Sequence, residues 1–355
     1  MKTATFEFGK QSLADWIAEN RDCEKMVLVG TVHCDLWDDN FKEKISKNVS
    51  KIRREINIGW ASFDLLFGFD LIAKDFHPLE FDVKDMHLTD WEGEINDEDI
   101  PDDATEEQPS SILKMLVNKK YGTRFVYQNG ILTSENGRVL IHYPNVKGQV
   151  IIPDTIDTIG RLAFAGIYEP EFSVFLPNGI VQIEENAFDM SDGLVSINFP
   201  DSLLFLGESA FCGTNLSEVL LPDCVEEIPA FCFQYAPVEK MHLPENLKYI
   251  RFAAFVGLWC DDVKLPQSVE VVESWSISGQ YETISLPESL KDIAYDFYFE
   301  EMIVGPEEMK PYVDIHPDNP VYYSEDGILY SRATGKEVLG KAGREQYLLE
   351  QKKGK

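Results

Sequence analysis

The sequence predicts a β-rich, right-handed solenoid of stacked repeats with hairpin caps, preceded by a small α/β or α+β domain. Two observations support this prediction. From residue 153 onward a proline recurs every 19 to 24 residues, each time after a short apolar alternation. The first 100 residues show no such recurrence. A repeat of this length is typical of a solenoid, because one repeat cannot bury its apolar face alone and must stack on its neighbours.

Several positions keep a fixed register with the proline of each repeat. The repeat prolines are Pro153, Pro177, Pro200, Pro222, Pro244, Pro266, Pro287 and, more weakly, Pro306. An aliphatic residue stands three and again six positions after each of the first seven. Eleven positions after the first five stands a phenylalanine preceded by alanine or cysteine: Phe164, Phe188, Phe211, Phe233 and Phe255.

This register predicts the local structure of one repeat. The apolar alternation is typical of a short strand with one buried face, and the proline ends the strand because it has no N–H to donate to a sheet. Polar residues then turn the chain, and the aliphatic positions return it to the core. We expect each phenylalanine ring to stack on the rings of the neighbouring repeats.

The repeat resembles the leucine-rich repeat of BspA-like surface proteins. Residues 152–164 have the pattern Ile-Pro-x-x-Ile-x-x-Ile-Gly-x-x-Ala-Phe, and 176–188 and 243–255 repeat it. The resemblance covers about residues 120–340 and includes flanking hairpins with Asn-Gly and Asp-Gly turns. It implies a leucine-rich-repeat solenoid that binds proteins rather than one that catalyses a reaction. Relatives are often displayed on cell surfaces, where they contact host or matrix proteins.

The pattern also suggests domain boundaries. We expect an N-terminal mixed domain over 1–100, an acidic linker with a short helix over 101–120, an N-terminal hairpin cap over 121–149, an array of about seven repeats over 150–306, a C-terminal hairpin cap over 307–340 and a polar tail over 341–355. The last repeats depart from the pattern, with Ile277 and Tyr298 at the phenylalanine position. Either a partner docks at this end, or the repeats adapt to the cap.

Apolar spacing predicts the elements of the first 120 residues. They are a helix over 12–20, a buried strand over 26–30, an amphipathic helix over 41–56, a short strand over 81–83 and a helix over 112–119. Between Glu92 and Glu107 lie nine acidic residues and no base, which is typical of a solvated linker.

The charge balance argues against several kinds of partner. The chain of 355 residues has 62 acidic and 32 basic residues, a formal net charge of −30. Nucleic acids and anionic membranes are bound by basic patches, so neither is expected as a partner. No stretch approaches the roughly 20 apolar residues that span a bilayer, and the N-terminus lacks a secretory pattern. We therefore expect a cytoplasmic protein without membrane insertion. The sequence leaves its oligomeric state open.

One segment of the N-terminal domain is a candidate for chemistry. His33 and Asp35 follow the strand expected at 26–30, and metal hydrolases place ligands at such a strand end. A polar loop with a hydrogen-bonded histidine explains the same residues. The six cysteines form no Cys-x-x-Cys pair, and neither a phosphate-binding glycine loop nor a nucleophile elbow is present. We expect no catalytic residues, no resident metal and no cofactor.

The strand position two residues before each repeat proline is expected to face outward. The candidate binding residues on this face are Ile151, Phe175, Leu220, Lys240, His242 and Lys264. The first three are apolar where a solvated face is usually polar, so either they form an exposed binding patch or another part of the chain packs over them. The last three form a small basic spot, which is either a docking point or an ordinary solvated surface.

These observations favour non-catalytic protein–protein recognition through the repeat sheet, with a protein partner. One alternative is a metal-binding or metal-dependent hydrolase-like N-terminal domain that the repeats target to its substrate. Another is an acidic inhibitor or immunity-type protein that binds a basic partner through charge.

Overall fold

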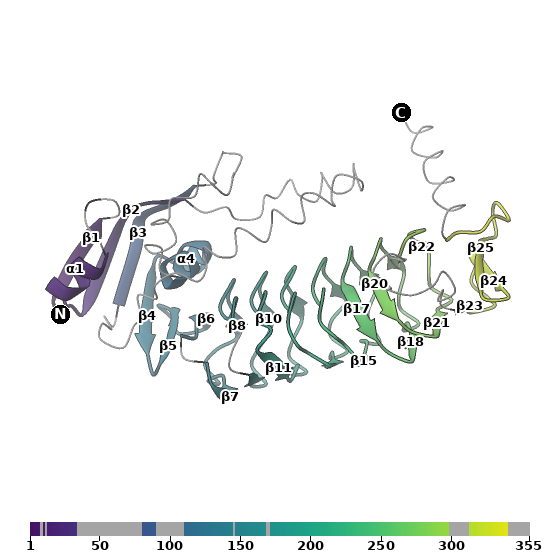
Figure 1. The fold of residues 1–355 in the computed structure, drawn as a ribbon, viewed down its shortest axis with the longest axis horizontal. Coiled ribbons are helices and arrows are strands. Elements are labelled where there is room, and N and C mark those ends of the chain that lie inside the picture. Colours follow the sequence, from purple (N-terminus) through teal and green to yellow (C-terminus); the bar gives the residue numbers. More distant parts are fainter. Residues whose placement is uncertain are drawn as a thin grey trace. The chain divides into compact units, whose positions relative to one another are not determined.

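The computed structural model describes residues 1–7, 10, 13–33, 80–89, 110–144, 146–167, 171–297 and 312–339. The chain divides into two compact units, Met1–Asn145 and Val146–Lys355 (Figure 1). Among the described residues, no helix is both long and apolar enough to cross a membrane.

The first unit is built on a mixed sheet. Within this unit the strand order is β1-β2-β3-β4-β5-β6. The strands are β1 (Thr3–Glu7), β2 (Lys25–His33), β3 (Glu80–Thr89), β4 (Arg124–Gln128), β5 (Ile131–Ser134) and β6 (Val139–His142). The first three are parallel to one another, and β4 to β6 continue the sheet antiparallel. The helices α1 (Leu13–Glu19) and α4 (Ser110–Val117) and the 3-10 helix η2 (Lys119–Tyr121) accompany it.

One apolar cluster joins the two α-helices to all six strands. Phe6, Trp16 and Met26 enter it from β1, α1 and β2, and Met115 enters it from α4. The Trp16 indole N–H also donates to the Thr5 carbonyl at 2.9 Å, so this buried ring has a partner for its only polar atom. The helix expected over 112–119 is therefore part of a core rather than of a linker.

The first unit differs from the expected domain division. The N-terminal cap expected over 121–149 begins with strand β4, but β4 pairs antiparallel with β3, with Phe81 opposite Phe125. The edge of β3 would otherwise expose unpaired N–H and C=O groups, and β4 satisfies them. The Asn129-Gly130 turn lies between β4 and β5 as expected, and both residues have positive φ, 55° and 82°. Residues 121–144 thus extend the N-terminal sheet.

The other elements expected for this unit are either confirmed or lie outside the described residues. The helix expected over 12–20 lies at Leu13–Glu19, and the strands expected over 26–30 and 81–83 lie within the longer β2 and β3. The helix expected over 41–56 and the acidic stretch from Glu92 to Glu107 lie outside the described residues.

The second unit is a β-solenoid, as the repeats predict. Strands that precede the repeat prolines, together with β23 of the last turn, form the face that we call the proline-side sheet: β7 (Gly148–Ile151), β9 (Phe172–Phe175), β11 (Leu194–Ile197), β13 (Glu218–Leu220), β15 (Lys240–His242), β18 (Asp262–Lys264), β21 (Thr283–Leu286) and β23 (Tyr312–Ile315). They are hydrogen-bonded in three groups, β7-β9-β11, β13-β15 and β18-β21-β23.

Shorter strands that follow the prolines form the face that we call the second sheet: β8 (Thr158–Ile159), β10 (Gln182–Ile183), β12 (Phe205–Leu206), β14 (Glu227–Ile228), β16 (Tyr249–Ile250), β19 (Val271–Val272) and β22 (Asp292–Ile293). They are hydrogen-bonded in two groups, β8-β10-β12 and β14-β16-β19-β22.

The strands that pair within these two sheets are parallel, and successive turns stack in order (Figure 1). A third pairing joins β17 (Phe255–Trp259) to β20 (Ile277–Gln280). At the C-terminal end, β24 (Tyr322–Glu325) and β25 (Ile328–Ser331) form the expected hairpin around Asp326-Gly327. Pro306, Tyr298 and the tail over 341–355 lie outside the described residues.

The phenylalanines of the repeat form a continuous stack inside the solenoid. Ring centroids of Phe164 and Phe188 lie 4.7 Å apart, and those of Phe211 lie 5.1 Å from Phe188 and 5.3 Å from Phe233. Phe255 continues the stack 5.1 Å beyond Phe233. These rings are nearly parallel and buried, so the expected stacking is confirmed. Where Ile277 replaces the ring, it is buried in the same core.

A backbone feature of the repeat has no signal in the residue types. Nine positions after six of the repeat prolines, the residue has φ between 51° and 60°, in the left-handed region: Leu162, Asn186, Ser209, Phe231, Ala253 and Trp275. None is glycine. This conformation turns the chain immediately before the small residue and the stacked ring, and it is imposed by the surrounding stack rather than by local preference.

Candidate functional site

The outward side chains of the proline-side sheet are exposed in this unit. Ile151 is 64% exposed, Phe175 49% and Leu220 42%, whereas the preceding Val150 and Val219 are buried. This alternation is that of a strand with one buried and one outward face. The structure therefore places the three apolar candidates on an outward surface, which we call the apolar column.

The strand register places two of these residues, Ile151 and Phe175, side by side. Ile151 pairs with Phe175 between β7 and β9. Asn198, one turn further on, does not extend the column with another apolar group. Its side-chain oxygen accepts from the Leu176 N–H at 2.7 Å, and its side-chain nitrogen donates to the Leu176 carbonyl at 2.9 Å. Asn198 thus satisfies the backbone of the previous turn and separates Phe175 from Leu220.

The basic candidates lie further along the same face and are exposed. Leu220 pairs with His242, and Glu218 with Lys240, between β13 and β15. Lys240 forms an ion pair with Glu218, so its charge has an acidic partner on the neighbouring strand. Lys264 stands opposite Ser285 on β21, next to Asp262 opposite Thr283. Charges of both signs alternate here, which is the pattern of a solvated ladder more than of a basic docking point.

The face continues two turns beyond the last expected candidate, Lys264, through β21 to β23. Ser285 pairs with Asp314 and Thr283 with Tyr312 on β23. Asp314 and Tyr312 are exposed and in register with the outward positions. Sequence reasoning missed them because the residues after β23, His316-Pro317, do not keep the apolar-x-apolar-Pro spacing.

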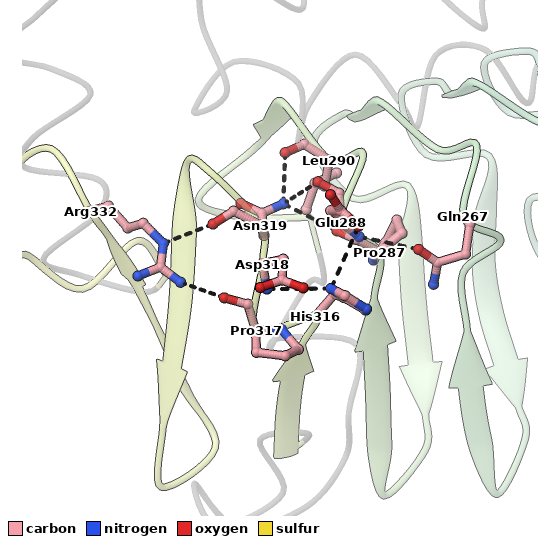
Figure 2. Close-up of polar contacts among 9 residues, drawn as sticks. All are labelled: Gln267, Pro287, Glu288, Leu290, His316, Pro317, Asp318, Asn319 and Arg332. Carbon is pink, nitrogen blue, oxygen red and sulfur yellow. Dashed lines mark hydrogen bonds and ion pairs between the residues drawn. The ribbon is translucent and has the colours of Figure 1, made fainter.

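A polar cluster closes the C-terminal end of the stack (Figure 2). Its centre is Asn319, which is 1% exposed and stands where Leu290 stands one turn earlier. The Asn319 side-chain nitrogen donates to the carbonyls of Pro287, Glu288 and Leu290 at 2.9–3.1 Å. Its side-chain oxygen accepts from the N–H groups of Val321 and Tyr322 at 2.9 and 2.7 Å.

Around Asn319 lie the only three described residues whose ligand atoms are grouped closely enough to hold a metal: Glu288, His316 and Asp318, within 4.8 Å of one another. The His316 Nδ1 lies 3.9 Å from a Glu288 oxygen and accepts from the Asp318 backbone N–H at 3.3 Å (Figure 2). Both carboxylates are exposed. Because Nδ1 already serves as an acceptor, the geometry fits a turn at the end of the stack, and nothing further indicates a bound cation.

Of the two candidate metal ligands of the N-terminal unit, His33 and Asp35, the structure describes only His33. His33 is the last residue of β2 and pairs with Thr89 of β3. Asp35 lies outside the described residues.

The buried cysteines of the solenoid are poorly suited to nucleophilic chemistry. Burial raises the pKa of the Cys212 thiol well above its ordinary value, and the neighbouring Asp189 carboxyl raises it further. Burial likewise raises the pKa of the Cys232 thiol. A thiol with a raised pKa stays protonated near neutrality and reacts slowly. Asp189 is itself buried, and burial raises the pKa of its carboxyl well above the usual range.

Comparison with known proteins identifies the repeat. Residues 158–283 match, in six copies, the family model described as BspA type Leucine rich repeat region. None of the curated proteins matches the chain. A repeat of this kind supports a protein-interaction or surface role.

Solved structures of bacterial leucine-rich repeat proteins are also similar. One from Bacteroides ovatus is 21% identical over 48% of this chain and 54% of its own, with a TM-score of 0.35. One from Eubacterium ventriosum is 17% identical over 52% of each chain, with a TM-score of 0.40. A leucine rich cell surface protein from Faecalibacterium prausnitzii is 16% identical over 60% of each chain, with a TM-score of 0.41. The match thus spans between half and two thirds of their lengths.

Proposed function

Residues 158–283 form a BspA-type leucine-rich repeat region, and we propose that the chain uses this solenoid to recognise a protein partner without catalysis. The proposed contact surface is the outward face of the proline-side sheet. The observation that supports it is the exposure of Ile151, Phe175 and Leu220. A parallel sheet usually has both faces covered, so three apolar side chains on its open face favour an interface.

The net charge of the chain and the distribution of apolar and charged residues on this face narrow the class of partner. The net charge of −30 disfavours nucleic acid and anionic lipid. The face has an apolar part, near Ile151 and Phe175, and a mixed polar part, near Lys240 and Lys264. An apolar centre beside a charged rim is the usual anatomy of a protein interface. Lys240, His242 and Lys264 are proposed as rim contacts that affect association rate and specificity more than affinity.

The test uses the full chain as bait in its native lysate, with quantitative mass spectrometry of what is captured. The variants are Ile151→Ser, Phe175→Ser and the double variant, and the matched control is Ile328→Ser, an exposed apolar residue of the C-terminal hairpin. We expect a partner that is retained by the control and reduced by about tenfold in the double variant, with all melting temperatures unchanged. Equal capture by every variant, or a loss shared by the control, overturns the proposal.

The location of the protein in the cell is a question separate from its binding function. The sequence-based expectation is a cytoplasmic protein, whereas one protein of similar structure is described as a cell surface protein. Fractionation of cells that express the full chain, with protease treatment of intact cells, separates the two: protection favours the cytoplasm, and digestion favours the surface.

A further inference from the structure

The second sheet of the solenoid has an apolar surface of its own. Val181, Leu204 and Phe205, which we call the second-sheet patch, are 37%, 42% and 59% exposed. The N–H groups of Leu204 and Phe205 both donate to the Val181 carbonyl, at 2.9 and 3.2 Å, so the three residues lie on adjacent turns. They belong to β10 and β12 or to the residues just before them. Sequence reasoning considered only the proline-side face and missed them.

The later turns show what a solvated version of this surface looks like. Four positions after the repeat proline, where Val181 and Leu204 stand, the next four turns have Glu226, Lys248, Glu270 and Lys291. Lys248 pairs with Glu226 at 2.8 Å, and Lys291 with Glu270 at 2.7 Å. Exposed ion-pair ladders of this kind keep a parallel stack hydrated. The apolar side chains of turns two and three are therefore a local departure from the chain's own pattern.

The part of the chain that contains the patch is acidic. Residues 146–217 have ten acidic residues and two basic ones, Lys147 and Arg161, and of the acidic residues Glu184 and Asp189 are buried. Arg161 is already paired with Glu185 at 3.0 Å. An apolar centre in an acidic field favours a partner that is apolar and basic, because opposite charge steers and holds the encounter. A second copy of this chain is a poor occupant, since each copy has a formal net charge of −30.

We propose that the second-sheet patch docks a partner segment in which one or two large apolar side chains are flanked by lysine or arginine. The apolar side chains contact Val181, Leu204 and Phe205, and the flanking cations face the carboxylates of the first three turns. This site is distinct from the apolar column of the proline-side sheet, and neither depends on the other.

The experiment uses the full chain and three labelled synthetic peptides, followed by fluorescence anisotropy. One peptide has a Leu-Phe-Leu centre flanked by lysines, one has the same centre flanked by glutamates, and one has a Ser-Ser-Ser centre flanked by lysines. We expect the first to bind, with an affinity that falls as salt is raised. The glutamate and serine peptides are expected to bind at least about tenfold more weakly, because each lacks one of the two required features.

Paired variants assign the binding to the patch. Leu204→Ser with Phe205→Ser is expected to weaken binding of the first peptide by about tenfold, whereas Ile151→Ser with Phe175→Ser leaves it unchanged. No binding of the first peptide, equal binding of all three, or equal sensitivity to both variant pairs overturns the proposal. Two further results would overturn the proposal, because each shows another occupant of the patch. A concentration-dependent dimer that Phe205→Ser abolishes would show that a second copy of the chain covers it. A marked fall in the melting temperature of that variant would show that the chain itself covers it.

Discussion

The side-chain nitrogen of Asn319 donates to the carbonyl of Leu290 at 2.9 Å, from the position that Leu290 itself occupies one turn earlier. In the earlier turns, the aliphatic residue at this position is buried in the core of the solenoid. The asparagine instead satisfies three carbonyls of the last full turn and two N–H groups of the cap. Arg332, which follows the hairpin strand β25, donates its Nε–H to the Asn319 backbone carbonyl at 2.8 Å. In the part of the chain that the structure describes, the buried side chain of Asn319 thus closes the C-terminal end of the solenoid.

This relationship predicts a large cost for Asn319→Leu. Leucine matches the size and the repeat pattern but removes a hydrogen-bond partner from three backbone carbonyls and two N–H groups, which are buried or partly buried. We expect the free energy of unfolding to fall by about 3–5 kcal/mol, measured by urea denaturation. The matched control is Asn246→Leu, because Asn246 makes one exposed bond, to the Asp223 carbonyl at 2.9 Å. The control should change stability by less than about 1 kcal/mol, and equal effects of the two substitutions would contradict the capping role.

The phenylalanine stack predicts a second large effect. Phe211 lies between Phe188 and Phe233 and is fully buried. Phe211→Ala removes a ring with neighbours on both sides and leaves a cavity, so we expect unfolding to become easier by about 3–5 kcal/mol. Phe175→Ala, at an exposed ring, should change stability by no more than about 0.5 kcal/mol. A Phe211→Ala variant with an unchanged denaturation midpoint would show that the ring stack contributes little.

Much of the solenoid could be predicted because its signal is repeated. The register of proline, aliphatic residues and phenylalanine identified the strands, the ring stack and the outward position of Phe175. The end of the stack gave a weaker signal, because one asparagine at an aliphatic position has no repeat to compare with. The sequence predicts a cap at β4, because an Asn129-Gly130 turn fits a hairpin in either unit. Only the pairing of Phe125 with Phe81, far away in sequence, places it in the first unit.

The candidate binding residues likewise divide into those that the sequence pattern predicts and those that it does not. Ile151 and Leu220 follow from the period-2 alternation that precedes each proline. Leu204 and Phe205 do not, since the second-sheet strands are two residues long and show no alternation from which an outward side could be inferred. The buried carboxyl of Asp189 is likewise invisible in sequence, where an acidic residue between apolar ones is usually exposed.

At the left-handed backbone position of the repeat, nine residues after the proline, the residue type varies from turn to turn. We nevertheless expect the shape of the side chain at this position to affect stability. Ser209 has φ of 52°, and its N–H donates to the Ala230 carbonyl of the next turn at 3.0 Å. A branched Cβ crowds the backbone in this region, so Ser209→Val should cost about 1–2 kcal/mol. Ser209→Gly should stay within about 1 kcal/mol of the wild type, because glycine relieves strain but loses more entropy on folding.

The control for this prediction is Ser196→Val, at an exposed position of β11. Valine suits a strand, so this variant should be as stable as the wild type or slightly more stable. Thermal and urea denaturation of the three variants test the point. A Ser209→Val variant as stable as Ser209→Gly would show that the backbone adopts another conformation at this position.

The buried Asp189 predicts how stability depends on pH. Burial raises the pKa of its carboxyl well above the ordinary 3.8, although the Cys212 thiol and the Met190 N–H partly oppose the shift. The folded chain therefore binds this proton more tightly than the unfolded chain does. Its contribution to stability is fully present below pH 3.8 and is lost as the pH rises through the folded pKa.

Asp189→Asn removes this titration while keeping an acceptor for the thiol. The variant should match the wild type in acid and become progressively more stable than it as the pH rises toward neutrality, measured by urea denaturation at several pH values below 8. That upper limit keeps the Cys212 thiol, whose pKa burial raises, protonated throughout. If the Asp189→Asn curve ran parallel to the wild-type curve, or if its advantage shrank with rising pH, the buried carboxyl would have to ionise at least as readily in the folded chain as in the unfolded one.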